Sequence, residues 1–135
     1  MNKVHTQHTK VAYGHFLKRR WRAFGHARRG IGFCIKEETH FRLQVLVSVI
    51  TIVVGVVVGL SRMEWLLVVV CIILVLTLEA VNTAMEHLCN VVQPDYHPGI
   101  KRVKDVAAGA VLIAAVGSCV VGCFIFLPKL SALFQ

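Results

Sequence analysis

The sequence predicts an all-α integral membrane protein, in which an N-terminal amphipathic interfacial helix precedes three transmembrane helices. Hydrophobic residues make up 56% of the 135 residues and the mean hydropathy is +0.69, more apolar surface than a soluble domain of this size can bury. These residues lie in three runs that are each long enough to cross about 30 Å of hydrocarbon. Lys and Arg lie mostly before the first run, and the net charge is +8. A soluble nucleic-acid-binding protein is excluded, because it would not also carry three such runs.

Residues 10–36 are predicted to form a helix at the membrane surface. Apolar side chains recur there at helical spacing among many cations, so the helix would rest on an anionic lipid surface with its apolar side down. Four glycines between positions 14 and 32 weaken the helix propensity, and a flexible basic tail is the alternative. The recurring apolar residues are Tyr13, Leu17, Trp21 and Phe24.

The three membrane spans are predicted at residues 43–61, 65–92 and 106–127, within a single membrane domain over residues 1–135. The first is rich in Val and Ile, the second admits polar residues after Leu78, and the third is apolar to Leu127. Residues 61–64 and 93–105 are predicted linkers, the second with two prolines and a glycine. The five cysteines include no CxxC pair, which does not fit a zinc site or a disulfide framework.

The distribution of basic residues predicts the orientation. Lys and Arg gather before the first span and in the linker before the third, whereas Arg62 and Lys129 fall on the opposite side. Cytoplasmic loops carry the excess of positive charge. We therefore expect a multi-pass protein whose N-terminus and second linker are cytoplasmic.

The second span carries a polar stripe, formed by Glu79, Asn82, Glu86 and Asn90. At about 100° per residue these side chains lie within about 60° of Glu79. A carboxylate inside a span is costly and persists where it meets a partner, a cation or water. The stripe falls at the cytoplasmic boundary of the membrane, where a site could join a lipid-dissolved substrate to a water-dissolved one.

Four carboxylates are expected at this same depth, with Lys and Arg nearby: Glu38, Glu79, Glu86 and Asp105. Paired carboxylates suit Mg²⁺ held jointly with substrate phosphates, and Lys and Arg suit the phosphates themselves. Inter-helix salt bridges with long side chains reaching to water are the alternative interpretation. No GxGxxG or complete P-loop is present, so a phosphate site would be built from side chains on helices.

The stretch EAVNTAME at 79–86, the HP pair at 97–98 and KRVKDVAAGAVL at 101–112 resemble the prokaryotic diacylglycerol kinase/undecaprenol kinase family. The resemblance covers roughly residues 15 to 130. It extends to HARRGI at 26–31, to Glu38 with the FR pair at 41–42, and to FLPKL at 126–130. It implies a small homotrimeric lipid kinase of the bacterial inner membrane, with ATP as co-substrate and Mg²⁺ as cofactor.

The resemblance also implies roles for individual residues. Glu79 would be the catalytic base, Glu38 and Glu86 would hold the metal, and Asn82 and Arg42 would order the site. In the trimer, neighbouring subunits would contribute residues to one site. The residues implied at the nucleotide are Arg19, His26, Glu38, Glu86, Asp95, Tyr96, His97, Lys104 and Asp105.

Two positions depart from the family pattern, with Asn90 in place of an Asp and His40 in place of an Asn. The flanking motifs favour undecaprenol as the lipid acceptor, with diacylglycerol as the alternative. A non-enzymatic oligomeric channel or accessory protein is a further alternative. A pore would need polar residues along the full depth of a span, whereas the span is apolar from Trp65 to Leu78 apart from Thr77.

Overall fold

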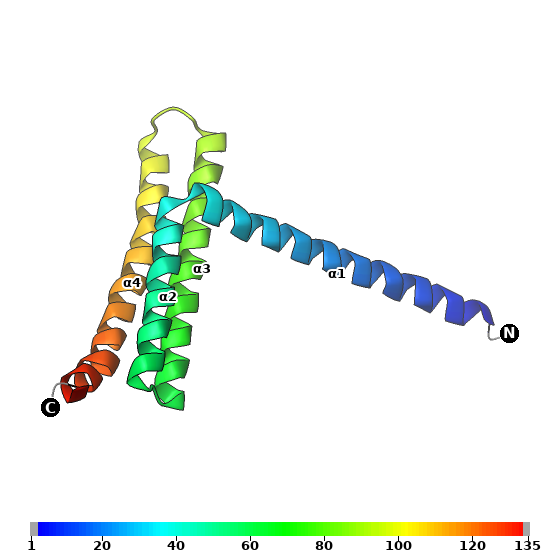
Figure 1. The fold of residues 1–135 in the computed structure, drawn as a ribbon. Coiled ribbons are helices and arrows are strands. Elements are labelled where there is room, and N and C mark those ends of the chain that lie inside the picture. Colours follow the sequence, from blue (N-terminus) through cyan, green and yellow to red (C-terminus); the bar gives the residue numbers. More distant parts are fainter. Residues whose placement is uncertain (1–2, 134–135) are drawn as a thin grey trace.

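The computed structural model describes the backbone of residues 3–133 and the side chains of residues 20–132. Within these ranges the chain forms helices and no strands: α1 (Lys3–Glu37), α2 (Thr39–Val58), α3 (Arg62–Val92) and α4 (Pro98–Leu133). Helices α2, α3 and α4 lie side by side as a bundle, and α1 projects from it (Figure 1). The helices of the bundle are all long and apolar enough to cross a membrane, which confirms the predicted all-helical class with three candidate spans.

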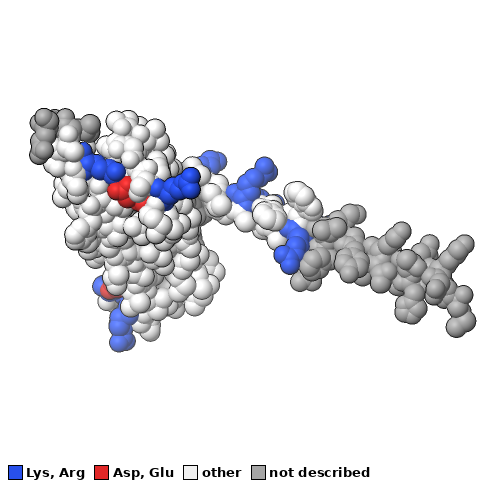
Figure 2. Space-filling model, turned by 90° about the horizontal axis from the view of Figure 1, so that it is seen from below, with Lys and Arg blue, Asp and Glu red and all other residues white. Residues whose placement is uncertain are grey.

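Helix α1 is continuous despite its glycines. It ends where Glu38 adopts extended backbone angles (φ −101°, ψ 113°), which lets α2 leave in a new direction. Among its described side chains, Trp21 and Phe24 are 75% and 72% exposed and so remain away from the bundle. Lys and Arg side chains lie along the described part of α1, whereas the face of the bundle visible in Figure 2 is mostly uncharged.

The turn between α2 and α3 is shorter than the predicted linker at 61–64. Gly59 takes the left-handed conformation (φ 67°) that ends α2, and Ser61 caps α3. The Ser61 hydroxyl accepts from the Glu64 N–H at 3.4 Å, and the Glu64 carboxylate accepts from the Ser61 N–H at 2.7 Å. This capping box places Glu64 in the first turn of α3, and the SxxE spacing is its sequence signal.

The same end of the bundle is fastened by two further contacts. Gly55 on α2 is buried against Leu60 and Trp65, so an added Cβ there would lie 2.9 Å from Leu60 Cδ1 and 3.0 Å from Trp65 Cη2. From α4, the Lys129 ammonium lies 3.2 Å from Glu64 Oε2 and donates to the Gly59 carbonyl at 3.3 Å. The three helices of the bundle are therefore joined at this end by polar contacts.

Helices α3 and α4 pack together more extensively than any other pair. Helix α4 begins at Pro98, earlier than the predicted start at 106, because proline needs no N–H partner in a first helical turn. Helix α3 has 31 residues and at about 1.5 Å per residue extends about 46 Å, beyond the roughly 30 Å of hydrocarbon. Its polar C-terminal third is long enough to leave the apolar layer.

Candidate active site

The part of the polar stripe of α3 that is formed by Glu79, Asn82 and Thr83 faces the interior of the bundle. Glu79 and Thr83 are each 5% exposed and Asn82 is 9% exposed, whereas Leu88 on the opposite side is 55% exposed. The burial decreases along the stripe, since Glu86 is half-buried and Asn90 is exposed. The stripe thus runs from the interior of the bundle to its surface.

Glu79 is held from the neighbouring helix. The Gln44 amide on α2 donates from Nε2 to Glu79 Oε2 at 3.0 Å. Gln44 Oε1 is also buried but has no hydrogen-bond partner among the described residues. Sequence analysis did not identify Gln44, although a single amide within the apolar stretch from Leu43 to Val47 is an available signal.

Glu86 and Asn82 form a pair one helical turn apart. The Asn82 amide donates from Nδ2 to Glu86 Oε1 at 3.0 Å, while its own Oδ1 is buried without a partner in the described part of the chain. A half-buried carboxylate beside a free amide oxygen is an arrangement of the oxygen donors that Mg²⁺ prefers.

Glu38 reaches the same region from the junction of α1 and α2. Its Oε1 lies 3.2 Å from Nε2 of His87, the residue that follows Glu86 on α3. The His87 ring also packs edge-on against Phe33 of α1, with ring centroids 5.0 Å apart. These contacts dock the end of α1 on α3 and bring the segments that carry Glu38 and Glu86 together. His87 was not identified from the sequence.

Cys34 of α1 is buried one helical turn before Glu38, whose N–H donates to the Cys34 carbonyl at 3.0 Å. Burial raises the pKa of the Cys34 thiol above its ordinary value, and the negative charges of Glu38 and Glu79 raise it further. The charges of both carboxylates therefore act on this thiol. Cys34 on α1, Glu38 at the junction and Glu79 on α3 therefore belong to one acidic region.

Helix α4 supplies the cations of the site. Lys104 donates from Nζ to Asn90 Oδ1 at 2.6 Å, and Lys101 forms an ion pair with Asp105 at the same distance. Asn90, one of the two positions at which this chain departs from the family pattern, therefore contacts a lysine that the resemblance implies at the nucleotide.

The other predicted site residues make no side-chain contact with Glu38, Glu79 or Glu86 in the part of the chain whose side chains the structure describes, although the Arg42 N–H donates to the Glu38 carbonyl at 3.2 Å. Arg42 donates to Thr39 Oγ1 at 3.0 Å, within its own helix, and His26 on α1 lies 2.9 Å from Arg29. The Arg19 side chain lies outside the described residues. The remaining three, Asp95, Tyr96 and His97, are exposed in the connection between α3 and α4.

A metal-binding role for Glu38 and Glu86 has to be weighed against their surroundings. Among the described side chains, no group of three or more His, Cys, Asp or Glu residues could hold a metal ion. Mg²⁺ commonly binds one or two carboxylates together with waters and substrate phosphates. Glu86, with the unpaired Asn82 oxygen beside it, offers oxygen ligands of this kind, and Glu38 lies on the segment that contacts His87, the next residue of α3.

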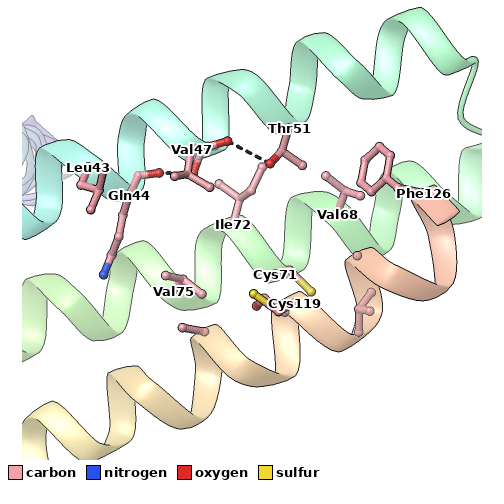
Figure 3. A pocket seen from close by; sticks show the side chains of 15 residues that line it. Leu43, Gln44, Val47, Thr51, Val68, Cys71, Ile72, Val75, Cys119 and Phe126 are labelled. Atoms are coloured by element: carbon pink, nitrogen blue, oxygen red, sulfur yellow. Dashed lines mark hydrogen bonds between the residues drawn. The ribbon is translucent and has the colours of Figure 1, made fainter. Parts of the chain in front are cut away.

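An apolar cavity of about 340 Å³ lies between α2, α3 and α4. It extends along α2 from Gln44 through Thr51 and reaches Phe126 on α4 (Figure 3). Its wall is mostly apolar, with hydroxyls at intervals. Ser118 contributes one of these hydroxyls, which is buried and has no partner in the described residues. Because Gln44 both lines the cavity and bonds to Glu79, the cavity adjoins the buried carboxylate.

Comparison with known proteins identifies the family of this chain. The sequence pattern of the family described as prokaryotic diacylglycerol kinase matches residues 25–126, most of the chain. The chain belongs to this family. It is therefore a membrane protein from a prokaryotic family of lipid kinases, as the resemblance predicted.

Individual members of the prokaryotic diacylglycerol kinase family are similar over most of the chain. An undecaprenol kinase of Bacillus subtilis is 40% identical over 114 residues, which are 84% of this chain and 93% of that protein. A diacylglycerol kinase of Synechocystis is 32% identical over 112 residues, 82% of this chain and 64% of that protein. One of Pseudomonas aeruginosa is 33% identical over 98 residues, 73% of this chain and 80% of that protein.

Proposed function

We propose that this protein transfers the γ-phosphate of Mg·ATP to the hydroxyl of a membrane lipid, with undecaprenol as the favoured acceptor. The observation that carries the proposal is the link between the apolar cavity and the buried carboxylate, made by the Gln44–Glu79 hydrogen bond of 3.0 Å. A lipid chain in the cavity would present its hydroxyl toward Glu79. The polar stripe continues from Glu79 through Glu86 to the exposed Asn90, and these groups would face the nucleotide.

The chemistry divides among the chain's own residues. Glu79 accepts the proton of the lipid hydroxyl, from within hydrogen-bond reach, as that oxygen attacks the γ-phosphorus of ATP. The bond from this phosphorus to the β–γ bridging oxygen breaks, and ADP leaves. Lys104 and Lys101 offset the charge of the phosphates, with Asn82 and Asp105 ordering the groups around them. Mg²⁺ bound by Glu38 and Glu86 would supply charge neutralisation for the phosphates.

The choice of lipid rests on similarity. The Bacillus subtilis relative is an undecaprenol kinase and shares 40% identity over 93% of its length. The relatives named diacylglycerol kinase are less similar. The cavity wall of Val, Ile, Leu and Phe side chains suits either an isoprenoid or an acyl chain, so diacylglycerol is the alternative acceptor.

The proposed setting is a homotrimer in the bacterial inner membrane with a cytoplasmic N-terminus. In each candidate span, only 11% to 22% of the most apolar 18-residue segment is buried within one chain. Large helix faces are therefore available to lipid and to neighbouring subunits. The exposed basic α1 would lie on the anionic inner surface of the membrane. The non-enzymatic alternative loses its support, because the chain belongs to a kinase family.

The test is transfer of labelled γ-phosphate from Mg·ATP to lipid by purified protein in mixed micelles. Undecaprenol and diacylglycerol are offered separately. We expect label in undecaprenol, loss of label with a chelator, and a drop on the order of 10²- to 10⁴-fold for Glu79→Gln because the base is removed.

The matched control is Glu37→Gln, the same change in an exposed carboxylate outside the site, which should retain activity. Label in diacylglycerol alone would reverse the choice of acceptor. Folded native protein that labels neither lipid would refute the kinase proposal, and undiminished transfer by Glu79→Gln would refute the role of Glu79.

A further inference from the structure

We infer that Gln44 is the positioning residue of the reaction: it fixes the orientation of the Glu79 carboxylate at the inner end of the lipid cavity. This inference rests on the proposed function of Glu79 as base. Gln44 belongs to α2 and Glu79 to α3, so their hydrogen bond of 3.0 Å also connects two spans.

The geometry defines which atom of the amide contacts the carboxylate. In Figure 3 the side-chain nitrogen of Gln44 points away from α2 toward α3. A carboxylate only accepts hydrogen bonds, so Glu79 Oε2 requires the NH₂ group of the amide and not its oxygen. Gln44 thus donates to one carboxylate oxygen and leaves the second available for the substrate proton.

No other side chain shares this task within the described residues. The Gln44 amide is the one side-chain hydrogen-bond partner that Glu79 has there. The neighbouring polar groups are engaged elsewhere: Asn82 with Glu86, Lys104 with Asn90, and Glu38 with His87. The orientation of a carboxylate that is 5% exposed therefore depends on a neutral amide.

A base held by one donor reacts better than a free one for a geometric reason. The glutamate side chain turns about three bonds, and only a fraction of its rotamers bring an oxygen close to a hydroxyl presented from the cavity. Misplacement by about 1 Å can cost about 10²-fold in rate. The buried, unpaired Gln44 Oε1 indicates that the amide is placed for Glu79 at the expense of its own second hydrogen bond.

The experiment compares Gln44→Leu with the native protein in the lipid phosphorylation assay. Leucine keeps the approximate volume and removes the donor, so we expect kcat to fall on the order of 10- to 100-fold. The KM for ATP should remain within about two-fold, because Gln44 does not touch the nucleotide. Gln93→Leu, the same change at the end of α3, is the control and should retain native kcat.

Double variants separate positioning from a general structural effect. In a Glu79→Asp background, whose shorter carboxylate no longer meets the amide, Gln44→Leu should cause little further loss. In a Glu86→Gln background it should cause the full loss seen in the native chain. Equal losses in both backgrounds would overturn the inference.

A variant that keeps polarity guards against misfolding. Gln44→Glu retains the size of the side chain but replaces the amide donor with a second carboxyl group that competes with Glu79 for a proton, so its kcat should also fall below that of the native protein. Native kcat in either Gln44 variant would refute the inference while leaving the kinase proposal intact. Native protein that phosphorylates neither lipid would refute both.

Discussion

Cys34 provides a residue-scale test of the acidic region. Its pKa is raised by burial and then by the charges of Glu38 and Glu79. Replacing Glu38 by Gln removes one of these charges, lowers the thiol pKa and increases the thiolate fraction at a given pH below that pKa. The measurement uses proteins that retain Cys34 as their single cysteine. Maleimide should label Cys34 faster in the Glu38→Gln protein than in the protein with the native Glu38.

The control for the Cys34 experiment is Glu37→Gln, because Glu37 does not contribute to the raised pKa. Its labelling rate should equal that of the native site. In all three proteins the rate should rise with pH as the thiol ionises. Identical rates for Glu38→Gln and the native site would contradict the placement of Glu38 beside Cys34.

At the same scale, the sequence predicted some residues of the site and missed others. Helical periodicity, which is local information, predicted that the polar residues of α3 share one face, and the structure adds that Glu79, Asn82 and Thr83 on this face are buried. Gln44 and His87 meet their partners across 35 and 49 residues of sequence, and no local pattern encodes such a contact. The Asn90–Lys104 hydrogen bond was likewise not predicted, because it depends on how α4 packs on α3.

At the scale of elements, Gly55 tests the close approach at the α2–α3 hairpin. An added Cβ would lie 3.0 Å from the rigid Trp65 ring, so Gly55→Ala should destabilise the protein by about 1–3 kcal/mol through overpacking. Gly117 on α4 has no neighbouring atom within 4 Å of an added Cβ. Gly117→Ala should therefore be neutral or slightly stabilising in one subunit.

Thermal unfolding in detergent gives the comparison between the two alanine variants. A transition temperature for Gly55→Ala equal to that of Gly117→Ala would contradict the tight packing at Trp65. The reverse order, with Gly117→Ala the less stable, would indicate that α4 packs through Gly117 on a second subunit.

The helices of the bundle were predictable from their apolar runs, and so was the end of α3 at Val92, but the residues at which the helices begin were not. Each helix of the bundle begins before the apolar run it contains, because polar residues continue the backbone hydrogen bonds once a cap is available. Ser61 and Glu64 provide that cap for α3, and Pro98 begins α4. Hydrophobicity defines where a helix meets lipid, whereas capping chemistry defines where it starts.

For the whole molecule, the proposed trimer is tested by mixing subunits. If neighbouring chains contribute Glu79 and Lys104 to one site, a mixture of Glu79→Gln and Lys104→Met subunits would assemble some sites with both native residues. We expect partial recovery of lipid phosphorylation in co-assembled protein and none when the two variants are purified apart. No recovery after verified co-assembly would place both residues in a single subunit's site.

The fold class of the whole molecule followed from composition and run length. Its assembly does not follow in the same way, because helix faces that contact lipid and faces that contact another subunit carry the same apolar residues. The large exposed apolar surface of α2, α3 and α4 is compatible with either neighbour. Stoichiometry therefore has to be measured.

The length of α3 has a consequence for how the membrane acts on the enzyme. Glu79 lies 17 residues beyond Arg62, about 25 Å along the axis, on a helix whose N-terminal end is held by the Lys129 contacts. The protein fixes how far Glu79 lies from that end of the helix, whereas the lipids fix where the boundary between hydrocarbon and water lies. A thinner bilayer would expose the carboxylate to water and a thicker one would submerge it. Bilayer thickness thus becomes a control on turnover.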